Sequence, residues 1–407
     1  MRYLLLNQFY PADAAPTGVV LEALAERLAE QGHTVKVLCG AGGYAEMADF
    51  QTKAARVSGT FGSIEVIRLA SLSIGRRSHA GKLLNYFLYY CGVTCYLLWT
   101  PADLVVALTT PPYLSLLARA VTRLRGGRHA HWIMDLYPDV MVAHGMLRRG
   151  GLPHRLLRGL TKWGFGGNRC AAVLTLGPMM AEKIRLYLSK NQKAHWVPLW
   201  GCEGGEGMAR EVAELRALRG WGTDEVVFLY SGNMGLGHRL QESIAAAQIL
   251  ATRGERIRLA FYGNGKRKAE VEAALEKWGH GFASVGGYVD RQDLSAHLSS
   301  GDVHLASLDP AWDGTMLPSK LQGIFAAGRP VIFTGSRTGD VGRWILESGA
   351  GWVCAPEDID AHVAAMLEAL DPCVRERMGA AARKFSEKWF NKEVNVARIC
   401  ALLTEKE

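Results

Sequence analysis

A lysine stands at the start of an apolar helix in the sequence GTMLPSKLQGIFAAGRPVI, residues 314–332. Lysine is unfavourable at this position because the N-terminus of a helix already carries partial positive charge. A negative group from outside the chain would resolve the conflict, and the free N–H groups of the first turn together with the ammonium suit a diphosphate. The alternative is a surface lysine at an ordinary helix start. The candidates for this part of a diphosphate site are Thr315, Pro318, Ser319, Lys320 and Gln322.

A glycine-rich turn, YSGNMGLGHR at 230–239, follows an apolar strand and could form the other part of this site. Its glycines allow a tight turn that exposes backbone N–H groups, on which a phosphate can rest. The spacing is not G-x-G-x-x-G followed by a ribose-binding acid, so it does not predict a dinucleotide site. A loop that turns for packing alone is the alternative. The donor-binding candidates are Gly232, Asn233, Gly235, His238 and Arg239.

Two further turns in the same half of the chain could line a nucleotide site. FYGNGKRK at 261–268 supplies Gly263 and Asn264. GGYVDRQDL at 286–294 supplies Tyr288 and Val289, whose backbone groups could meet a base. The segment at 261–268 could equally be a turn without a ligand.

In the first half of the chain, HWIMDLYPDV at 131–140 places a carboxylate just past a strand. At such a strand end, Asp135 could act as a catalytic base or orient an acceptor hydroxyl. Asp139 has helix capping as its alternative role. The segments PTG at 16–18 and TTPPY at 109–113 should form the opposite wall. Besides Asp139, the acceptor-side candidates are Thr17, Gly18 and Thr110.

Short apolar strands alternate with amphipathic helices along the chain, which predicts parallel sheets covered by helices on both faces. A Pro- and Gly-rich stretch around 196–205 indicates a linker, after which the alternation restarts. We therefore expect an α/β protein with two Rossmann-like, doubly wound domains, 1–198 and 203–385, that face a cleft. Ligands should lie outside the carboxyl ends of the strands. A long last helix is expected at 374–404, and about 386–407 could pack back onto the first domain.

Charge is unevenly distributed over the 407 residues, whose formal net charge is +8. Residues 1–200 contain 23 Lys and Arg against 11 Asp and Glu, whereas residues 201–407 contain 24 against 28. The basic half favours anionic partners such as a pyrophosphate or lipid head groups, while the acidic half and the lack of a nucleic-acid-binding motif argue against nucleic acid. The eight cysteines are scattered without a C-x-x-C pair, which predicts reduced thiols in a cytoplasmic protein and no metal site.

The twenty residues 83–102 carry no charge and follow Arg76, Arg77 and Lys82. Their length could span a bilayer, but their tyrosines and internal polar residues favour an interface or a core. Three alternatives stay open: a helix on an anionic membrane surface involving 76–100, a buried helix, and a membrane span. The expected location is the cytoplasm, with peripheral attachment to the inner face of the cell membrane left open. The first residues, MRYLLLNQFYP, indicate a strand and not a signal peptide.

These motifs resemble the retaining glycosyltransferases of GT-B fold, family 4, and among them the bacterial branch that builds surface polysaccharide. The resemblance rests on YSGNMG with His238, the glycine loop at 263–265, GYV at 287–289 and PSKL with AAGRPVI, and in the first half on LAERLAEQGHTVKVL and DLYPD. It implies transfer of a sugar, usually from a UDP-sugar, to a saccharide or polyprenyl-pyrophosphate-linked acceptor, with retention and without an obligatory metal. The nucleotide-sugar is a substrate, so no cofactor is implied. The C-terminal domain would hold the nucleotide and the basic N-terminal domain the acceptor.

Four positions depart from the family pattern. The two glutamates of the family fall at Thr315 and Gly323, and its phosphate-loop Arg and Lys fall at Asn233 and His238. The ribose contacts of the family are therefore missing, and phosphate binding would shift to Lys320 and Arg239. A sub-branch with PSKLYGI at this place makes the glycine compatible with an active enzyme.

The sequence thus predicts a glycosyltransferase of polysaccharide or lipid-linked sugar assembly. Lys320 would neutralise the departing diphosphate, and Asp135 would position or deprotonate the acceptor. Two alternatives stay open: a nucleotide-sugar 2-epimerase of the same fold, and a non-catalytic partner subunit.

Overall fold

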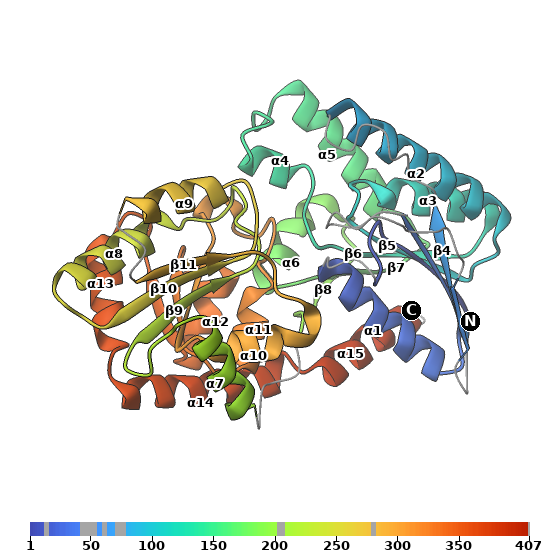
Figure 1. The fold of residues 1–407 in the computed structure, drawn as a ribbon. Coiled ribbons are helices and arrows are strands. Elements are labelled where there is room, and N and C mark those ends of the chain that lie inside the picture. Colours follow the sequence, from blue (N-terminus) through green and yellow to red (C-terminus); the bar gives the residue numbers. More distant parts are fainter. Residues whose placement is uncertain are drawn as a thin grey trace. The chain divides into compact units, whose positions relative to one another are not determined.

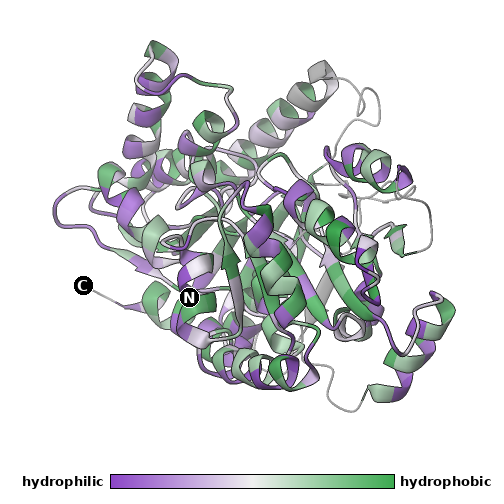
Figure 2. Ribbon diagram, turned by 90° about the vertical axis from the view of Figure 1, so that its left-hand side faces the viewer, coloured by the Kyte–Doolittle hydropathy of each residue, from purple (hydrophilic) through white to green (hydrophobic). Residues whose placement is uncertain are grey.

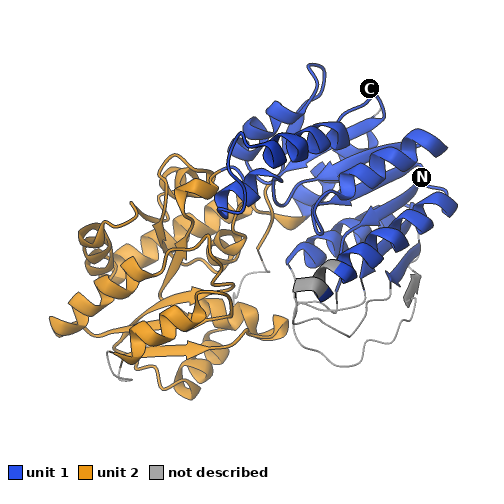
Figure 3. Ribbon diagram, turned by 90° about the horizontal axis from the view of Figure 1, so that it is seen from above, with its two compact units in different colours: residues 1–197, 314–316, 393–407 blue, residues 198–313, 317–392 orange. Residues whose placement is uncertain are grey.

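The computed structural model of the chain divides into two compact units (Figure 3). It describes residues 1–11, 16–40, 55–58, 63–69, 79–201, 208–277 and 282–405. Unit 1 comprises Met1–Val197, Gly314–Met316 and Glu393–Glu407, and unit 2 comprises Pro198–Asp313 and Leu317–Lys392. Each unit is a doubly wound α/β structure on a mainly parallel sheet, which confirms the predicted fold class.

Unit 1 is built on an eight-stranded sheet in the order β3-β4-β2-β1-β5-β6-β7-β8, in which only the edge strand β3 is antiparallel. Its strands are β1 (Arg2–Leu6), β2 (Thr34–Gly40), β3 (Ala55–Ser58), β4 (Ser63–Leu69), β5 (Leu104–Leu108), β6 (Arg128–Trp132), β7 (Cys170–Thr175) and β8 (Ala194–Trp196). The central strands are apolar throughout because helices cover both faces, and every residue of β5 is buried.

The helices of unit 1 form two layers, one on each face of this sheet (Figure 1). One layer contains α1 (Pro16–Glu30) and α15 (Lys392–Thr404), which are joined by an ion pair between Arg27 and Glu393. The other contains α2 (His79–Trp99), α3 (Leu114–Arg125) and α5 (Leu152–Phe165), with α3 packed against both of its neighbours. The shorter helices are α4 (Asp139–Ala143), α6 (Pro178–Ile184) and the 3-10 turn η1 (Arg185–Tyr187).

Unit 2 is built on a parallel six-stranded sheet in the order β11-β10-β9-β12-β13-β14. Its strands are β9 (Val226–Ser231), β10 (Ile257–Tyr262), β11 (Ala283–Gly286), β12 (Val303–Ser307), β13 (Val331–Thr334) and β14 (Gly351–Cys354). Its helices are α7 (Ala209–Leu218), α8 (Gln241–Thr252), α9 (Lys268–Glu276), α10 (Leu294–Ser300), α11 (Lys320–Ala326), α12 (Asp340–Ser348), α13 (Ile359–Glu368) and α14 (Pro372–Trp389), with 3-10 turns η2 (Arg291–Asp293) and η3 (Pro310–Trp312). In Figure 2 the strands are mostly hydrophobic, whereas polar and apolar residues alternate along the helices. This is the pattern expected of sheets buried between helices.

The long helix expected at 374–404 is two helices, α14 and α15, and this prediction was wrong. The chain turns after α14 because Phe390 inserts its ring into the core of unit 2, where only 3% of the side chain is exposed. The ring centroid lies 6.0 Å from that of Phe325, 5.4 Å from that of Phe385 and 5.3 Å from that of Trp344. A continuous helix would forfeit this burial.

The uncharged segment 83–102 forms most of α2, and the helix is neither fully buried nor a membrane span. Tyr89, Val93 and Leu97 form a buried stripe with helical spacing, while Phe87 and Trp99 are 61% and 84% exposed. No helix in the described ranges is long and apolar enough to cross a membrane. The basic residues 76–77 that precede the helix lie outside the described residues.

Replacing Phe390 with alanine should destabilise unit 2 by about 3 to 5 kcal/mol, because truncating a buried aromatic ring leaves a cavity. Urea unfolding followed by circular dichroism measures the change. The matched control is Val394→Ala, since this side chain is 57% exposed, and it should shift stability by less than about 0.5 kcal/mol. Equal unfolding midpoints for the two variants would contradict the packing role of Phe390.

Candidate functional site

Two glycine turns of unit 2 pack against each other at the carboxyl ends of β9 and β10. The φ angles of Gly232 and Gly263 are 124° and 135°, which side-chain-bearing residues rarely adopt. A Cβ on Gly263 would lie 2.1 Å from the carbonyl oxygen of Gly232. The N–H groups of Gly232 and Met234 donate to the carbonyls of Tyr262 and Asn264, each at 2.8 Å.

These hydrogen bonds change the role predicted for the turn at 230–239. The N–H groups of Gly232 and Met234 are already used, so these two donors are not available to a phosphate as the sequence suggested. The N–H of His238 likewise donates to the carbonyl of Gly235, at 3.1 Å. The glycines instead allow the turns, and the lysine described next, to approach one another closely.

Lys320, the first residue of α11, lies over the bend at Gly232. A Cβ on Gly232 would be 2.8 Å from Lys320 Cε. Lys320 Nζ donates to the carbonyl of Asn233 and to Nε2 of His238, both at 3.1 Å. It also lies 4.7 Å from the centre of the Tyr230 ring, where a cation is attracted to the aromatic face. The structure therefore brings together residues from the two motifs that the sequence singled out.

The orientation of His238 is fixed by the last residue of β12. His238 is 4% exposed, and its Nδ1 lies 2.6 Å from the carbonyl oxygen of Ser307. Because a carbonyl can only accept, Nδ1 carries the proton and Nε2 presents its lone pair to Lys320. Burial, and then the charge of Lys320, lowers the pKa of His238 to about 3, so the ring is neutral at physiological pH.

The groups that hold the ε-amine of Lys320 are neutral. The ion pairs of the described chain include none between a carboxylate and Lys320. Burial lowers the pKa of Lys320 to about 7, and a bound anion would raise it again. An ammonium has three N–H donors, of which two serve Asn233 and His238, so one remains for a ligand.

Arg239 is engaged differently from what the sequence suggested. Its guanidinium lies 2.7 Å from a carboxylate oxygen of Glu242, 3.5 Å from one of Asp309 and 3.4 Å from one of Glu357. Its N–H donates to Ser307 Oγ at 3.0 Å. Three carboxylates thus compensate its charge, which makes it a weaker phosphate ligand than Lys320.

Helix α11 lies between the Pro-Ser-Lys triplet and the Gly-Arg-Pro stop, as the sequence suggested. The helix has seven residues, and Ser319 is its N-cap without a side-chain capping bond. Pro318 is buried and precedes the N-cap instead of standing at the first helical position. The cation of Lys320 is therefore the main electrostatic feature here.

The remaining donor-side candidates are not among the contacts of Lys320 given above. Thr315 is 1% exposed, and its carbonyl accepts from the N–H of Leu136 at 2.7 Å. Gln322 is completely buried, and neither its amide nitrogen nor its amide oxygen has a hydrogen-bond partner. Tyr288 is 50% exposed beyond β11, with Val289 next to it. Nothing in these contacts assigns the four residues to a ligand.

In unit 1, the strand ends of β5 and β6 position Asp135. Thr109 Oγ1 accepts from the N–H of Met134 at 3.1 Å and from the N–H of Asp135 at 3.0 Å. Asp135 also forms an isolated β-bridge with Met316. Burial raises the pKa of Asp135 to about 6. Its carboxylate is therefore ionised at neutral pH and has a pKa suited to proton transfer.

The end of β1 links the two neighbouring segments of the predicted acceptor side. Asn7 Nδ2 donates to Thr17 Oγ1 at 3.4 Å, and the N–H of Gln8 donates to the carbonyl of Thr110 at 2.7 Å. Gly18 lies against Tyr10, because a Cβ there would be 3.1 Å from Tyr10 Cα. Two of the candidates, Thr17 and Thr110, are thus hydrogen-bonded to the residues that follow β1, at the carboxyl end of the sheet.

Asp139 opens α4 and is 6% exposed. Its carboxylate accepts a hydrogen bond from the hydroxyl of Tyr187. The expected capping role is wrong, because the N-cap of α4 is Pro138 and no side chain caps the helix. The carboxylate is instead used in a buried contact within unit 1.

Sequence reasoning missed Ser307, and it did not single out Tyr230 or Thr109 within the segments 230–239 and 109–113. Tyr230 and Ser307 stand at the ends of the neighbouring strands β9 and β12, and Thr109 directly follows β5. Comparing what stands at the ends of all adjacent strands, and not only in glycine-rich loops, could have found them.

Two family descriptions match the chain, one in each unit. The Glycosyl transferase 4-like domain matches residues 17–200, and Glycosyl transferases group 1 matches residues 225–372. Together they span more than half of the chain. The chain belongs to the group 1 glycosyltransferases.

Named relatives and solved structures agree with this assignment. The glycosyltransferase WbjE of Pseudomonas aeruginosa is 23% identical over 303 residues, which is 74% of each chain. The colanic acid biosynthesis glycosyl transferase WcaI of Escherichia coli K12 is 26% identical over 410 aligned positions, which cover 98% of each chain.

Among solved structures, WaaG, a glycosyltransferase involved in lipopolysaccharide biosynthesis, has a TM-score of 0.69 at 18% identity and covers 100% of both chains. Sucrose-phosphate synthase of Thermosynechococcus elongatus has a TM-score of 0.73 at 16% identity, over 99% of this chain and 98% of its own. HepE of Anabaena, in complex with UDP-glucose, has a TM-score of 0.70 at 11% identity over 99% of each chain. The structures share the GT-B fold with this glycosyltransferase.

The ε-amine of Lys320 should become reactive near neutral pH, because its pKa is lowered to about 7. We expect its acetylation by acetic anhydride, measured by mass spectrometry across pH 5 to 11, to rise about three pH units below that of a free lysine derivative added as the reference. A profile that coincides with the reference would contradict the buried environment of the ammonium.

Proposed function

We propose that this glycosyltransferase moves a hexosyl group from a nucleotide-diphosphate sugar, a UDP-sugar by preference, to a saccharide or polyprenyl-pyrophosphate-linked acceptor in bacterial polysaccharide assembly, with retention. The observation that carries the proposal is the ammonium of Lys320, which neutral groups hold at a glycine bend, with no carboxylate partner in the described chain. The names of WcaI and WaaG support the pathway, and the UDP-glucose in HepE supports the donor.

In the proposed reaction, Lys320 stabilises the leaving group. As the bond between the anomeric carbon and the diphosphate oxygen breaks, negative charge develops on the diphosphate, and the remaining N–H of Lys320 donates to it. Asn233 and His238 already hold Nζ, so the cation needs little reorganisation during the reaction. His238 stays neutral and therefore orients the ammonium without competing for the negative charge.

Asp135 is the proposed base on the acceptor side. Its pKa of about 6 leaves it ionised at neutral pH, so it can take the proton of the acceptor hydroxyl. For retention, that hydroxyl attacks the anomeric carbon from the face that the diphosphate leaves. Thr109 fixes its backbone, which limits how far the carboxylate can move. The excess of cations in residues 1–200 would favour an acceptor that carries a pyrophosphate.

A lipid-linked acceptor would require unit 1 to reach a membrane, and we propose the outer surface of α2, α3 and α5 for this contact. Leu152, Leu156, Leu160 and Trp163 form an exposed apolar stripe on α5 at helical spacing. This helix carries three exposed cations and no acidic residue, namely Arg155, Arg158 and Lys162. Exposed apolar residues beside cations are what an anionic lipid surface attracts.

Lys320→Ala should lower kcat by about 100- to 1,000-fold, because one group that stabilises the leaving charge is removed. The assay follows transfer from a donor that is first selected by thermal shift among UDP-, GDP- and dTDP-sugars. Lys277→Ala, at the exposed end of α9, is the matched control and should retain wild-type turnover. Wild-type turnover and nucleotide affinity in Lys320→Ala would contradict the proposed role.

The same assay separates the alternatives. An epimerase would convert the donor sugar in the absence of any acceptor, which NMR of the incubated nucleotide-sugar detects. A non-catalytic subunit would show neither transfer nor donor hydrolysis as a purified single chain. Acceptor-dependent transfer by the single chain excludes both.

The full chain should sediment with vesicles that contain anionic lipid, and binding should weaken at high salt. Replacing both Leu156 and Trp163 with serine should reduce the bound fraction about tenfold or more, because two exposed apolar side chains lose their insertion energy. Leu346→Ser is the control, since this residue is 43% exposed on α12 of unit 2. Equal binding by all three proteins would exclude this surface as the membrane contact.

A further inference from the structure

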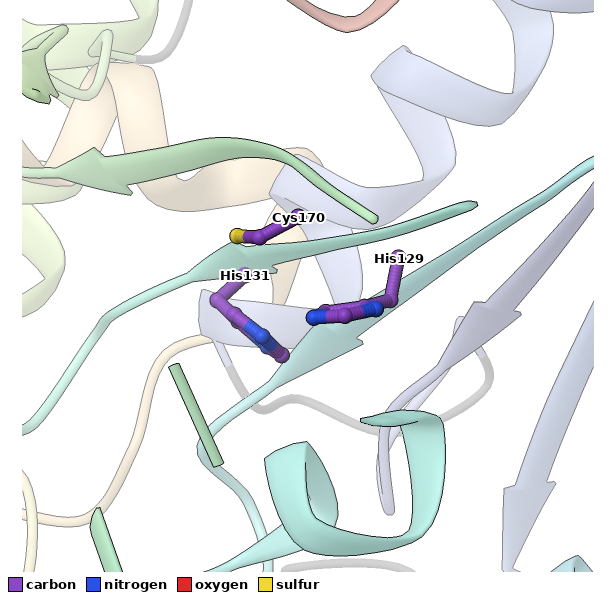
Figure 4. Close-up of side chains that lie close together, drawn as sticks. All are labelled: His129, His131 and Cys170. Atoms are coloured by element: carbon purple, nitrogen blue, oxygen red, sulfur yellow. The ribbon is translucent and has the colours of Figure 1, made fainter. Parts of the chain in front are cut away.

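Three metal-ligating side chains meet inside unit 1 (Figure 4). One of them, His131, lines the same small pocket as Thr109 and Asp135. His129 and His131 are alternate residues of β6, so both point to the same face of the sheet. Cys170 opens the adjacent strand β7 and is paired with His129 in the parallel register. One ligand atom from each of the three residues lies within 4.8 Å of the other two.

The hydrogen bonds around His129 leave one of its nitrogens free as a ligand. Thr122 Oγ1 donates to the carbonyl of Ala118 at 2.8 Å, so its lone pair accepts from His129 Nδ1, which lies 3.0 Å away. The proton is thereby placed on Nδ1, and Nε2, which has no partner, carries the lone pair. An outer hydrogen bond of this kind fixes the tautomer of a histidine that binds a metal.

His131 is a stronger anomaly, because it is completely buried and neither ring nitrogen has a hydrogen-bond partner. The carbonyls of Gly164 and Gly166 lie near the two rings without completing hydrogen bonds to His131 or to Nε2 of His129. A buried imidazole that lacks both partners loses the hydration of two polar atoms, and each atom left unsatisfied is destabilising. An ion bound to one of the two nitrogens would remove the penalty of that nitrogen.

We propose that His129, His131 and Cys170 bind one thiophilic, closed-shell metal ion of the Zn²⁺ or Cu⁺ class. Neutral imidazoles and a thiolate are the donor set that these ions prefer. The thiol proton of Cys170 leaves to solvent as the metal–sulfur bond forms, and no oxidant or reductant is needed. The seven cysteines in the described part of the chain form no disulfide, so Cys170 is free for this bond.

The charge near the site favours the monovalent ion of this class. The guanidinium of Arg119 acts on both imidazoles and on Cys170, and it is held against the ring of Trp163 at 4.7 Å. Cu⁺ with one thiolate is neutral, whereas Zn²⁺ with one thiolate adds a positive charge beside Arg119. The ion would join β6 to β7 below the strand end that carries Asp135, so its role here is structural.

The test measures metal binding to the full chain. We expect chain stripped with a chelator to bind one equivalent of Cu⁺ under anaerobic conditions or of Zn²⁺, measured by competition with a chromophoric chelator and by elemental analysis, and to melt at a higher temperature when loaded. Titration with Co²⁺ should give a sulfur-to-metal charge-transfer band. The dissociation constant of each ion is divided by the constant of the same ion for a free thiol peptide. A lower ratio for Cu⁺ than for Zn²⁺ would support the inference that the charge of Arg119 favours the monovalent ion.

Variants assign the ligands. Cys170→Ser should abolish the charge-transfer band, and His129→Gln should weaken binding at least tenfold, whereas Cys373→Ser, at an exposed cysteine of α14, should bind as the wild type does. If a variant does not fold, the wild-type measurements decide the matter. Failure of folded wild-type chain to bind either ion, or an unchanged charge-transfer band in Cys170→Ser, would overturn the proposal.

Discussion

The contact between the ammonium of Lys320 and the unprotonated nitrogen of His238 depends on three segments of unit 2 being held in register. The carbonyl of Ser307 orients the ring, the ring orients the ammonium, and the carbonyl of Asn233 completes the arrangement. Ser307 ends β12, which pairs with β9 on one side and β13 on the other. A shift of one residue in either ladder would turn the side chains of β12 to the opposite face and remove the carbonyl from His238.

This constraint also explains why the turns must be glycine-rich. Lys320 reaches Asn233 by passing over the backbone of Gly232, and Gly263 contacts the same peptide from the other side. A methyl group at either position would separate β9 from β10 or displace the lysine. The glycines that the sequence offered as phosphate ligands are therefore conditions for placing the cation, which is a different function from the one their motif suggests.

The sequence was most informative where a residue was unfavourable in its predicted local structure. Lys320 stood out because a cation opposes the helix dipole, and the structure gives it only neutral contacts. Alternation of strands and helices was sufficient for the fold class, because periodicity is a local property. Arg239 could have been judged better from sequence, since Glu242 stands only three residues later, in the first turn of α8.

The rest required tertiary information. The helix breaks at Phe390 because its ring packs against Phe325 and Trp344, which are distant in sequence. The helical periodicity of the sequence continues through this position, so it predicted one helix. The tautomer of His238 depends on Ser307, 69 residues away. His129 and His131 show the spacing of one strand face, but only the register between β6 and β7 brings Cys170 beside them. Such pairings arise from strand order, which a single sequence does not reveal.

The glycine at position 323, where the family pattern has a glutamate, affects the charge environment of Lys320. Position 323 lies three residues after Lys320 on α11, so a glutamate there would be its neighbour on the helix surface and could form an ion pair with it. Such a pair would compensate the charge that a diphosphate is proposed to meet. Glycine leaves the ammonium without a carboxylate. A Cβ added at position 323 would meet the side chain of Leu298, whose Cδ1 would lie 3.1 Å away. Under the proposed reaction, glycine at position 323 therefore keeps the charge of Lys320 available to the phosphates.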